Sequence, residues 1–411
     1  MDKLAVLAFS GGLDTSYCAA WLLEQGWRVH AITVNTGGFD ADELAKIEQR
    51  ARALGVAEFR VIDARKKLFD QTLRYLIFAN ALRGEVYPLC VSCEREVQAE
   101  TCATYARSVG AQAIVHGSTG AGNDQVRFDV ALRVLAPGIQ ILTPIREQAL
   151  SRAASTEYLA ARGFEVPAKT TAYSVNRGLW GATIGGGETH RSDGVLPEEA
   201  YVLTAARAAW PKQPESVRID FSQGVPMALD GRTLEPVTLI EELNQRGGLH
   251  GVGRGVHVGD TIIGIKGRVA FEAPAATTLI AAHRELEKLV LSRQQSFWKQ
   301  TLGELYASLI HEAHFCEPLC TDIEAFLSST QRRVTGRVHL QLWQGQATVL
   351  GATSPFSLMN PELAKYGEQS SLWSGAEAAG FSKLYGTQEL LWQRAGEAAR
   401  KAEETTHAVA S

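Results

Sequence analysis

Short apolar runs alternate with helical patterns over the first 142 residues, and this alternation limits the possible folds more than any other feature. Apolar runs of four to eight residues predict buried strands, and apolar residues at i, i+4 spacing predict helices. Strands separated by helices predict a parallel sheet covered on both faces. The expected strands are 3–9, 27–34, 59–62, 113–116 and 139–142, and the expected helices are 14–25, 41–54, 94–109 and 123–135.

From about residue 166 the pattern changes to strands joined by tight turns. Residues 217–221 alternate with period two before Gln223-Gly224, and two apolar runs flank Gln344-Gly345. A long helical stretch lies between these features, near 277–312. We therefore expect an α/β chain with three parts. These are a doubly wound parallel-sheet domain at 1–165, an α+β domain at 166–385 and a helical tail at 386–411. The tail is either a frayed end or a helix docked on another subunit.

Composition excludes several classes of protein. The 411-residue chain has a net charge of −4, which provides no basic surface for nucleic acid. No apolar run approaches the roughly 20 residues of a membrane helix, and the N-terminus lacks a signal-peptide pattern. Six cysteines are too few for a disulfide scaffold. We expect a cytoplasmic enzyme.

A glycine-rich loop separates the first expected strand from the first expected helix, and it reads Ser10-Gly11-Gly12-Leu13-Asp14-Thr15-Ser16. Such a turn lets backbone N–H groups close around phosphate oxygens, and the helix N-terminus adds a favourable dipole. Asp14 can hold Mg²⁺ on a polyphosphate or anchor the loop. The segment has neither a Walker ending nor G-x-G-x-x-G spacing. The structural alternative is a tight turn with a helix cap.

A second loop follows the expected strand at 113–116 and opens the helix at 123–135. Glycines, a hydroxyl, an amide, a carboxylate and a guanidinium converge there within His116–Phe128. Arg127 can pair with a carboxylate and Asp124 with an ammonium, which suits an amino-acid substrate. The alternative is a capped helix with a solvated face.

The first loop has the Ser-Gly-Gly-x-Asp-x-Ser motif of PP-loop ATP pyrophosphatases, which split ATP between the α and β phosphates. With the second loop included, the chain resembles the argininosuccinate synthase family from residue 4 to about residue 385. The shared runs are Tyr87-Pro88-Leu89, Asn123-Asp124-Gln125-Val126-Arg127-Phe128, Tyr173-Ser174-Val175-Asn176, Gly251-Val252-Gly253-Arg254, Gly264-Ile265-Lys266-Gly267-Arg268, Phe271-Glu272-Ala273-Pro274 and Ser354-Pro355-Phe356-Ser357-Leu358.

The resemblance implies an ATP-dependent ligase of arginine biosynthesis. It would join L-citrulline and L-aspartate to argininosuccinate through a citrullyl-adenylate, use Mg²⁺, and release AMP and pyrophosphate. Residues 1–165 would bind ATP and 166–385 would form the synthetase and oligomerisation domain of a homotetramer. Three alternatives stay open: the same chemistry on another ureido acceptor, a tRNA-modifying PP-loop enzyme, and a non-catalytic nucleotide sensor. The acidic balance and the lack of a catalytic C-x-x-C with a basic appended domain count against the tRNA enzyme.

The resemblance also assigns site residues. The catalytic residues would be Asp14, Asp124 and Arg127, and no side chain is assigned as a metal ligand. ATP would be bound by Ala8, Ser10, Gly11, Gly12, Asp14, Thr15, Ser16, Val34, His116 and Gly117. Aspartate would be bound by Thr119, Asn123 and Asp124. Citrulline would be bound by Tyr87, Ser92, Asn123, Arg127, Ser174, Thr183 and Phe271. Asp124, the substrate's own carboxylate or the departing phosphate would accept the proton of the attacking amine.

Several positions depart from the family pattern, and they gather around the citrulline site. Gly259 stands where many members have a Glu that pairs with the citrulline ammonium, and Phe271 stands where many have Tyr. Asn176-Arg177-Gly178 replaces Asp-Glu-Asn, and Ala121 replaces Lys. Either a neighbouring carboxylate such as Asp260 compensates for the lost Glu, or the acceptor has no free ammonium.

Two further patterns carry no functional assignment. Cys90 and Cys93 form a C-x-x-C, but no second pair has the spacing of a zinc site. His311 and His314 are expected to be surface residues or hydrogen-bonded core residues.

Overall fold

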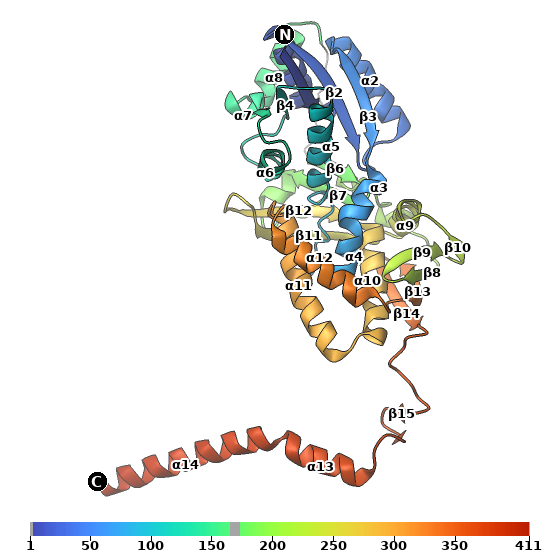
Figure 1. Ribbon diagram of the computed structural model, residues 1–411, viewed down its shortest axis with the longest axis vertical. Helices are drawn as coiled ribbons and strands as arrows, with labels where there is room; N and C mark the ends of the chain where they lie inside the picture. The colour runs from blue at the N-terminus through green and yellow to red at the C-terminus, as the bar shows by residue number, and fades with distance from the viewer. Residues whose placement is uncertain (1–2, 165–172, 411) are drawn as a thin grey trace. The chain divides into compact units, whose positions relative to one another are not determined.

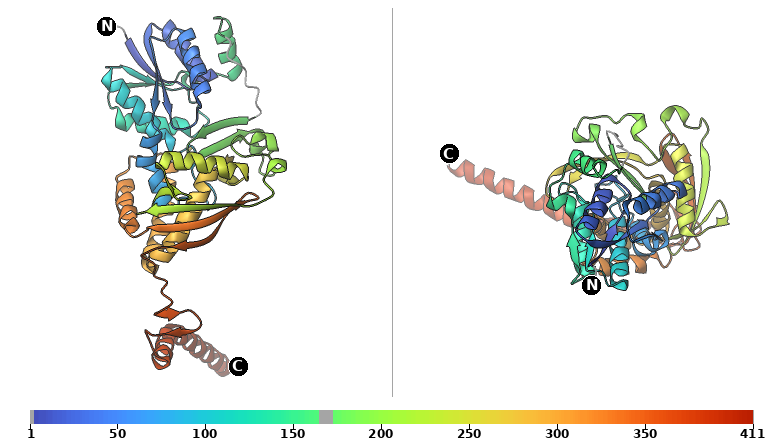
Figure 2. Two further views of the ribbon diagram at one scale, coloured as in Figure 1. Left: turned by 90° about the vertical axis from the view of Figure 1, so that its right-hand side faces the viewer. Right: turned by 90° about the horizontal axis from the view of Figure 1, so that it is seen from above.

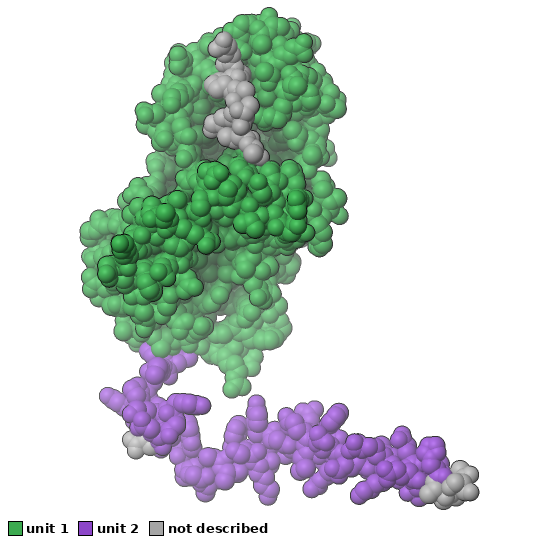
Figure 3. Space-filling model, turned by 180° about the vertical axis from the view of Figure 1, so that it is seen from behind, with its two compact units in different colours: residues 1–356 green, residues 357–411 purple. Residues whose placement is uncertain are grey.

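The structure is a computed structural model that describes residues 3–164 and 173–410. The chain forms two compact units, Met1–Phe356 and Ser357–Ser411 (Figure 3). The expected boundary between residues 165 and 166 lies outside the described residues and stays a prediction. Within those residues, no helix is both long enough and apolar enough to cross a membrane.

The first unit begins with the expected doubly wound sheet (Figures 1 and 2). Its strand order is β3-β2-β1-β4-β5, and every neighbouring pair is parallel. The α/β prediction is confirmed, with strand ends within one residue of those expected. The strands are β1 (Lys3–Ala8), β2 (Trp27–Asn35), β3 (Glu58–Asp63), β4 (Ala113–Val115) and β5 (Gln140–Leu142).

Alternate residues of a strand point to opposite faces of the sheet. Both faces of this sheet carry apolar residues, and helices cover both. Ala5 and Leu7 of β1 pack in one core with α1, α2 and α8, whereas Val6 packs in the other with α5 and α6. Helix α2 has a capping box formed by Asp40 and Glu43. The helices are α1 (Leu13–Glu24), α2 (Ala41–Leu54), α5 (Glu94–Ser108), α6 (Asp124–Leu135), α7 (Pro144–Glu147) and α8 (Arg152–Ala160).

Two antiparallel sheets follow in the same unit, with orders β10-β9-β8-β13-β14 and β11-β12-β7-β6. The two expected hairpin turns are confirmed: both residues of Gln223-Gly224 and of Gln344-Gly345 have positive φ, as a type I′ turn requires. The strands are β6 (Tyr173–Gly178), β7 (Gly181–Gly186), β8 (Glu215–Ser222), β9 (Val225–Leu229), β10 (Arg232–Thr233), β11 (Arg254–Asp260), β12 (Lys266–Glu272), β13 (Gly336–Trp343) and β14 (Gln346–Thr353).

The helical stretch expected at 277–312 is two helices: the first ends at Val290, and Ser292 caps the second together with Gln295. Helix α4 follows β3 in sequence but packs against α10, α11 and α12, so it joins the parallel sheet to the later region. The helices are α3 (Arg65–Leu68), a π-helical turn (Phe69–Leu73), α4 (Arg74–Ala79), α9 (Pro236–Leu249), α10 (Pro274–Val290), α11 (Arg293–His311) and α12 (Pro318–Gln331). Single 3₁₀ turns lie at Gly187–His190, Glu198–Ala200 and Arg207–Ala209.

The second unit contains the helix expected in the tail. It consists of the short strands β15 (Ala364–Lys365) and β16 (Gln369–Ser370), then α13 (Gly375–Tyr385) and α14 (Thr387–Ala410). Its large apolar side chains are exposed, including Leu384 and Trp392 at 75% and 74%. Docking of this tail on another subunit stays a prediction.

Candidate active site

The two glycine-rich loops leave neighbouring strands at the carboxyl edge of the parallel sheet. The first loop follows β1, the second follows β4, and these strands are hydrogen-bonded to each other. The chain winds outward from β1 on one side and from β4 on the other, so the strand order reverses between them. Ligands of doubly wound sheets bind at this reversal, beyond the carboxyl ends of the strands.

The first loop turns the chain sharply from β1 into α1. Gly11 has a φ of +69°, and a Cβ there would lie 2.9 Å from Ile47, so this position requires glycine. Gly12 is the N-cap of α1, and no side chain caps it in the described structure. The hydroxyl oxygens of Ser10 and Thr15 lie 3.3 Å apart beside it. A helix N-terminus without a side-chain cap, flanked by hydroxyl groups, can bind an anion.

Asp14 lies in the first turn of α1, directly against the second loop. A Cβ at Gly117 would lie 3.2 Å from the Asp14 backbone and also from Thr15, so the two loops approach closely because residue 117 is glycine. Burial raises the pKa of Asp14, and Arg152 opposes that shift. Burial disfavours the ionised form of a carboxyl group, and a nearby cation stabilises that form.

The side chain of His116 holds the second loop in place. Its Nε2 lies 3.0 Å from Asp129, and its Nδ1 accepts a hydrogen bond from the Ser118 N–H. This pattern assigns the proton to Nε2. Burial raises the pKa of Asp129, but hydrogen bonds from His116 and Arg146 keep it below its usual range. The expected ATP residue His116 therefore positions the loop through its ring.

Asp124 and Arg127 contact a third residue that was not predicted from the sequence, Arg95 at the start of α5. Arg95 donates to Asp124 Oδ2 at 3.0 Å and Arg127 donates to Oδ1 at 2.9 Å. Burial raises the pKa of Asp124, but the two guanidinium groups outweigh it and hold the pKa below its usual range. Arg95 is 29 residues from Asp124 in sequence, and no motif spacing connects them.

The remaining side-chain contacts of Arg127 and Asn123 are with the later part of the chain. Arg127 donates to the His311 carbonyl through Nε and Nη2, at 3.2 and 2.9 Å. The Asn123 side chain accepts from the Ile262 N–H at 3.0 Å, in the turn between β11 and β12. Elements of the later region therefore complete the site above α6.

Four of the expected citrulline residues gather into a buried group. Tyr87 and Phe271 are 4% and 3% exposed, with ring centres 5.3 Å apart. Thr183 pairs with Phe271 across β7 and β12, and Ser92 is buried. Ser174 lies on the same sheet but is exposed, and Thr119 is exposed in the second loop. Val34 and Ala8 lie near the carboxyl ends of β2 and β1.

The inner face of β11 carries a histidine where the expected carboxylate is missing. The ring of His257 stacks on Tyr87 at 5.6 Å, and a Cβ at Gly259 would lie 2.5 Å from His257 Nε2. Asp260 points to the opposite, exposed face of β11 and pairs with Lys266. The suggestion that Asp260 replaces the lost glutamate is therefore wrong, because strand residues alternate between faces.

At a second position that departs from the family pattern, Gly178, a buried carboxyl group occupies the space of the missing side chain. A Cβ at Gly178 would lie 1.4 Å from Glu94 Oε1, so Glu94 takes the space of the usual Asn side chain. Thr36 donates to Glu94 Oε2 at 2.6 Å, whereas Oε1 is buried without a hydrogen-bond partner in the described structure. Burial raises the pKa of Glu94 to about 8. The neighbouring departure, Arg177, donates to the Gly38 carbonyl at 2.9 Å.

The structure gives different results for the histidine pair, His311 and His314, and for the C-x-x-C pair, Cys90 and Cys93. His311 is buried and its Nδ1 has no partner among the described residues, so the expectation of a surface or hydrogen-bonded residue is wrong for it. His314 is exposed, as expected. Cys90 and Cys93 are buried, and burial raises the pKa of both thiols. Thiols in that state are poor nucleophiles and poor metal ligands. In the described part of the chain, no group of three His, Cys, Asp or Glu side chains could hold a metal ion.

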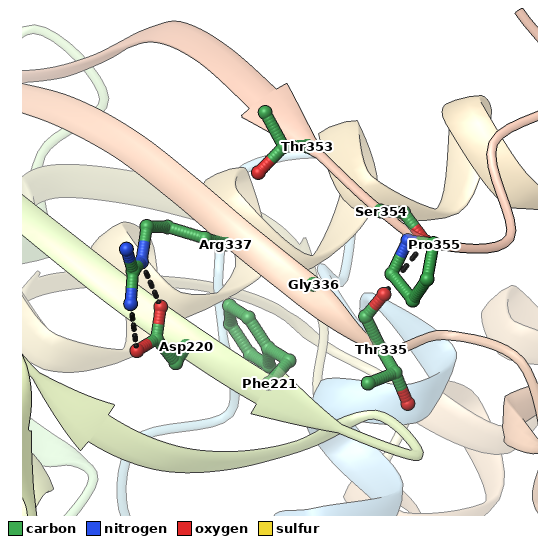
Figure 4. A pocket seen from close by; sticks show the side chains of 8 residues that line it. All are labelled: Asp220, Phe221, Thr335, Gly336, Arg337, Thr353, Ser354 and Pro355. Atoms are coloured by element: carbon green, nitrogen blue, oxygen red, sulfur yellow. Dashed lines mark hydrogen bonds and ion pairs between the residues drawn. The ribbon is translucent and has the colours of Figure 1, made fainter.

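A separate pocket lies on the five-stranded antiparallel sheet (Figure 4). It is lined by Asp220, Phe221, Thr335, Gly336, Arg337, Thr353, Ser354 and Pro355, and it contains none of the expected site residues. Arg337 donates to both carboxylate oxygens of Asp220, at 2.6 and 2.9 Å. Both charged groups are therefore already paired.

The doubly wound sheet and its two adjoining glycine loops define an α/β domain of the nucleotide-binding class. Residues 4–165 match the family model described as the arginosuccinate synthase N-terminal HUP domain, and residues 173–392 match the arginosuccinate synthase C-terminal domain. The chain belongs to the argininosuccinate synthase family.

Curated relatives agree over nearly the full length. Argininosuccinate synthase from Methanocaldococcus jannaschii is 40% identical over 394 residues, which cover 96% of this chain and 98% of the relative. The enzyme from Xanthomonas campestris is 41% identical over 395 residues, or 95% and 98% of the two chains. The enzyme from Rubrobacter xylanophilus is 40% identical over 391 residues, again 95% of both chains.

Proposed function

We propose that this protein is a carbon–nitrogen ligase that joins a ureido acceptor, citrulline, to L-aspartate and converts ATP to AMP and pyrophosphate. The observation that carries the proposal is the meeting of two substrate loops at one reversal point of the sheet. The first loop suits a polyphosphate, and the second suits an amino acid. Family membership over the whole chain supports the same reaction.

The first step requires a ureido oxygen to attack the α-phosphorus while pyrophosphate leaves. N–H groups of the first loop and of α1 would offset the negative charge that develops on the phosphates. The ureido oxygen is a weak nucleophile, so holding it at near-attack distance supplies much of the rate enhancement. Ser10, Thr15 and Ser16 would hold the phosphates and thereby fix this geometry.

A divalent cation would fit beside the first loop. Asp14 is a partly buried carboxyl whose ionised form is disfavoured, and it lies between the two loops. Asp14 would hold Mg²⁺ on the polyphosphate, where the cation would neutralise charge in the transition state.

In the second step the aspartate amine attacks the activated ureido carbon and forms the C–N bond. The C–O bond to the adenylate then breaks, and AMP leaves with the former ureido oxygen and the electron pair of that bond. Asp124 would bind the aspartate ammonium, because Arg95 and Arg127 keep its carboxylate ionised. The same low pKa makes Asp124 a poor proton acceptor. The substrate's own carboxylate or the departing phosphate would then take the proton.

The reaction is tested by measuring AMP and pyrophosphate from ATP and Mg²⁺, with citrulline and aspartate added separately and together. We expect equal amounts of both products when both substrates are present. Asp124→Asn should raise the KM for aspartate at least tenfold, and Glu157→Gln, at an exposed carboxylate of α8, should serve as the control. ATP binding without release of either product would refute the proposal.

We also propose that the enzyme is a cytoplasmic homotetramer and that the tail contributes to assembly. In α13 and α14 the side chains of Phe381, Leu384, Tyr385, Leu391 and Trp392 are all more than half exposed. Exposed apolar groups of this density are typical of a subunit interface. Light scattering should show a tetramer that dissociates in a Leu391→Glu/Trp392→Glu variant. A monomeric native protein would contradict the assignment.

A further inference from the structure

Four basic side chains surround the expected acceptor residues, and we call Arg83, Arg127, His257 and His311 the basic cluster. His257 lies on Tyr87, and Arg127 donates to the His311 carbonyl. Arg83 donates to the Asp260 carbonyl at 3.4 Å, which brings it to the same hairpin. These residues come from four separate parts of the chain, so no local pattern in the sequence indicates the cluster.

Three carboxylates that the structure describes near the basic cluster are each paired with a cation. Asp124 is held between Arg95 and Arg127. Glu312 accepts from Arg83 at 3.1 Å, and Asp260 accepts from Lys266 on the outer face of β11. The inner face of β11, which carries His257 and Gly259, therefore offers a substrate ammonium no carboxylate. Asp124 lies at the start of α6, where we propose that it binds the other substrate, aspartate.

The ring of His257 fits on the inner face of β11 because two neighbouring positions, Gly84 and Gly259, lack a side chain. A Cβ at Gly84 would lie 2.9 Å from the ring, and a Cβ at Gly259 would lie 2.5 Å from Nε2. The chain thus has an imidazole packed on Tyr87 and has no room for a glutamate at 259 while the ring is present.

The imidazoles provide polar atoms but no negative charge. His257 Nε2 and His311 Nδ1 are both buried without hydrogen-bond partners in the described structure. Burial and the nearby arginines lower the pKa of both rings, that of His311 to about 3. A neutral imidazole can donate to or accept from a substrate, but it cannot offset the charge of an ammonium.

We propose that the acceptor site does not select for an ammonium group, so that it takes ureido carboxylates without one as well as citrulline. This inference rests on the proposed ligase function and extends its substrate class. His257 would be the residue that replaces the ionic contact. Recognition would then depend on the ureido group, the chain length and the carboxylate.

The test compares citrulline with 5-ureidopentanoate, which is citrulline without its amino group. Both are assayed by pyrophosphate release with ATP, Mg²⁺ and aspartate. We expect the two kcat/KM values to agree within about tenfold, whereas loss of a buried ionic contact typically costs about 30-fold or more. A citrulline preference above that tenfold limit would overturn the inference but leave the ligase function standing. No release with either acceptor would refute the ligase function itself.

Variants of β11 test whether the inner face of this strand lies beside the ammonium group of bound citrulline. His257→Ala/Gly259→Glu removes the ring and adds a carboxylate on the inner face, and it should raise the preference for citrulline at least tenfold over His257→Ala alone. Val258→Glu adds the same charge on the outer face, where Val258 is 55% exposed, and should leave the preference unchanged. Melting temperatures and ATP binding would verify that each variant folds. Equal preferences in the double and single variants would overturn the assignment.

Discussion

Replacing Glu94 with glutamine should abolish a large part of the pH dependence of stability. Glu94 is 1% exposed, and its Oε1 lies against Gly178 without a partner in the described structure. Burial raises the pKa from 4.5 to about 8; Arg95 and the hydrogen bond from Thr36 oppose the shift, and Asp124 adds to it. Glutamine has nearly the same shape and stays neutral at every pH, so it removes the titration alone.

The direction follows from proton linkage. A group with a raised pKa in the folded state binds its proton more tightly there, so its stabilising contribution is complete below pH 4.5. That contribution disappears as the pH rises through 8. With these two values, the wild type should lose about 2–3 kcal/mol of unfolding free energy from this one group between pH 6 and pH 9. Glu94→Gln should lack this loss, whatever constant penalty the amide introduces.

Urea unfolding of the wild type and the variant at pH 6, 7, 8 and 9 measures the effect. The decisive quantity is the difference between the two pH profiles, because other titrating groups contribute equally to both proteins. Glu100→Gln is a matched control on the same helix, since Glu100 is partly exposed and pairs with Lys67 at 3.1 Å. A Glu94→Gln profile parallel to that of the wild type would refute the reasoning.

Three further predictions concern packing and charge. Gly178→Ala places a Cβ 1.4 Å from Glu94 Oε1 and should destabilise the fold by about 2 kcal/mol; Glu94→Ala/Gly178→Ala should recover most of this in thermal melts. Lys299→Met should destabilise by about 3–5 kcal/mol, because Lys299 and Glu287 form a buried pair at 2.6 Å; Lys299→Met/Glu287→Gln should be more stable than the single variant in urea titrations. Arg95→Gln removes one of two cations from Asp124, so steady-state kinetics should show a KM for aspartate raised about tenfold. An equal rise in the KM for ATP would contradict that role of Arg95.

Local sequence was sufficient to predict the parallel sheet and its loops, because each signal lies within a few adjacent residues. The turn at Gly11 and the strand-to-helix junctions are examples, and the helix at 41–54 has the predicted ends. The break at Ser292 was missed, although Ser292 and Gln295 have the spacing of a capping box. That signal was present in the sequence within the longer apolar periodicity.

The acceptor side could not be predicted in the same way, because its contacts join distant segments. Arg127 and His311 are 184 residues apart, and Arg83 and Glu312 are 229 apart. Whether a carboxylate such as Asp260 compensates for Gly259 depends on which face of a strand it occupies. The sequence alternates regularly over Val256–Asp260, but its valines lie on the exposed face, so apolar periodicity assigns the two faces the wrong way round. The contact between Glu94 and Gly178 also becomes evident only from the fold.

The glycine loops and the acceptor side differ in what fixes their geometry, and this difference affects how such an enzyme can change its substrate. The glycine loops that we propose for ATP binding are constrained by backbone geometry. Gly11 has a positive φ and leaves no room for a Cβ, a Cβ at Gly117 would be tightly packed at 3.2 Å, and His116 is fixed by Asp129. The acceptor wall instead depends on side chains of a β-hairpin that meets the nucleotide domain through few hydrogen bonds, such as the one between Asn123 and Ile262. Substitutions on the inner face of β11 can therefore alter the acceptor while adenylation chemistry is retained. The pairing of Gly259 with His257 is the kind of change that this architecture permits.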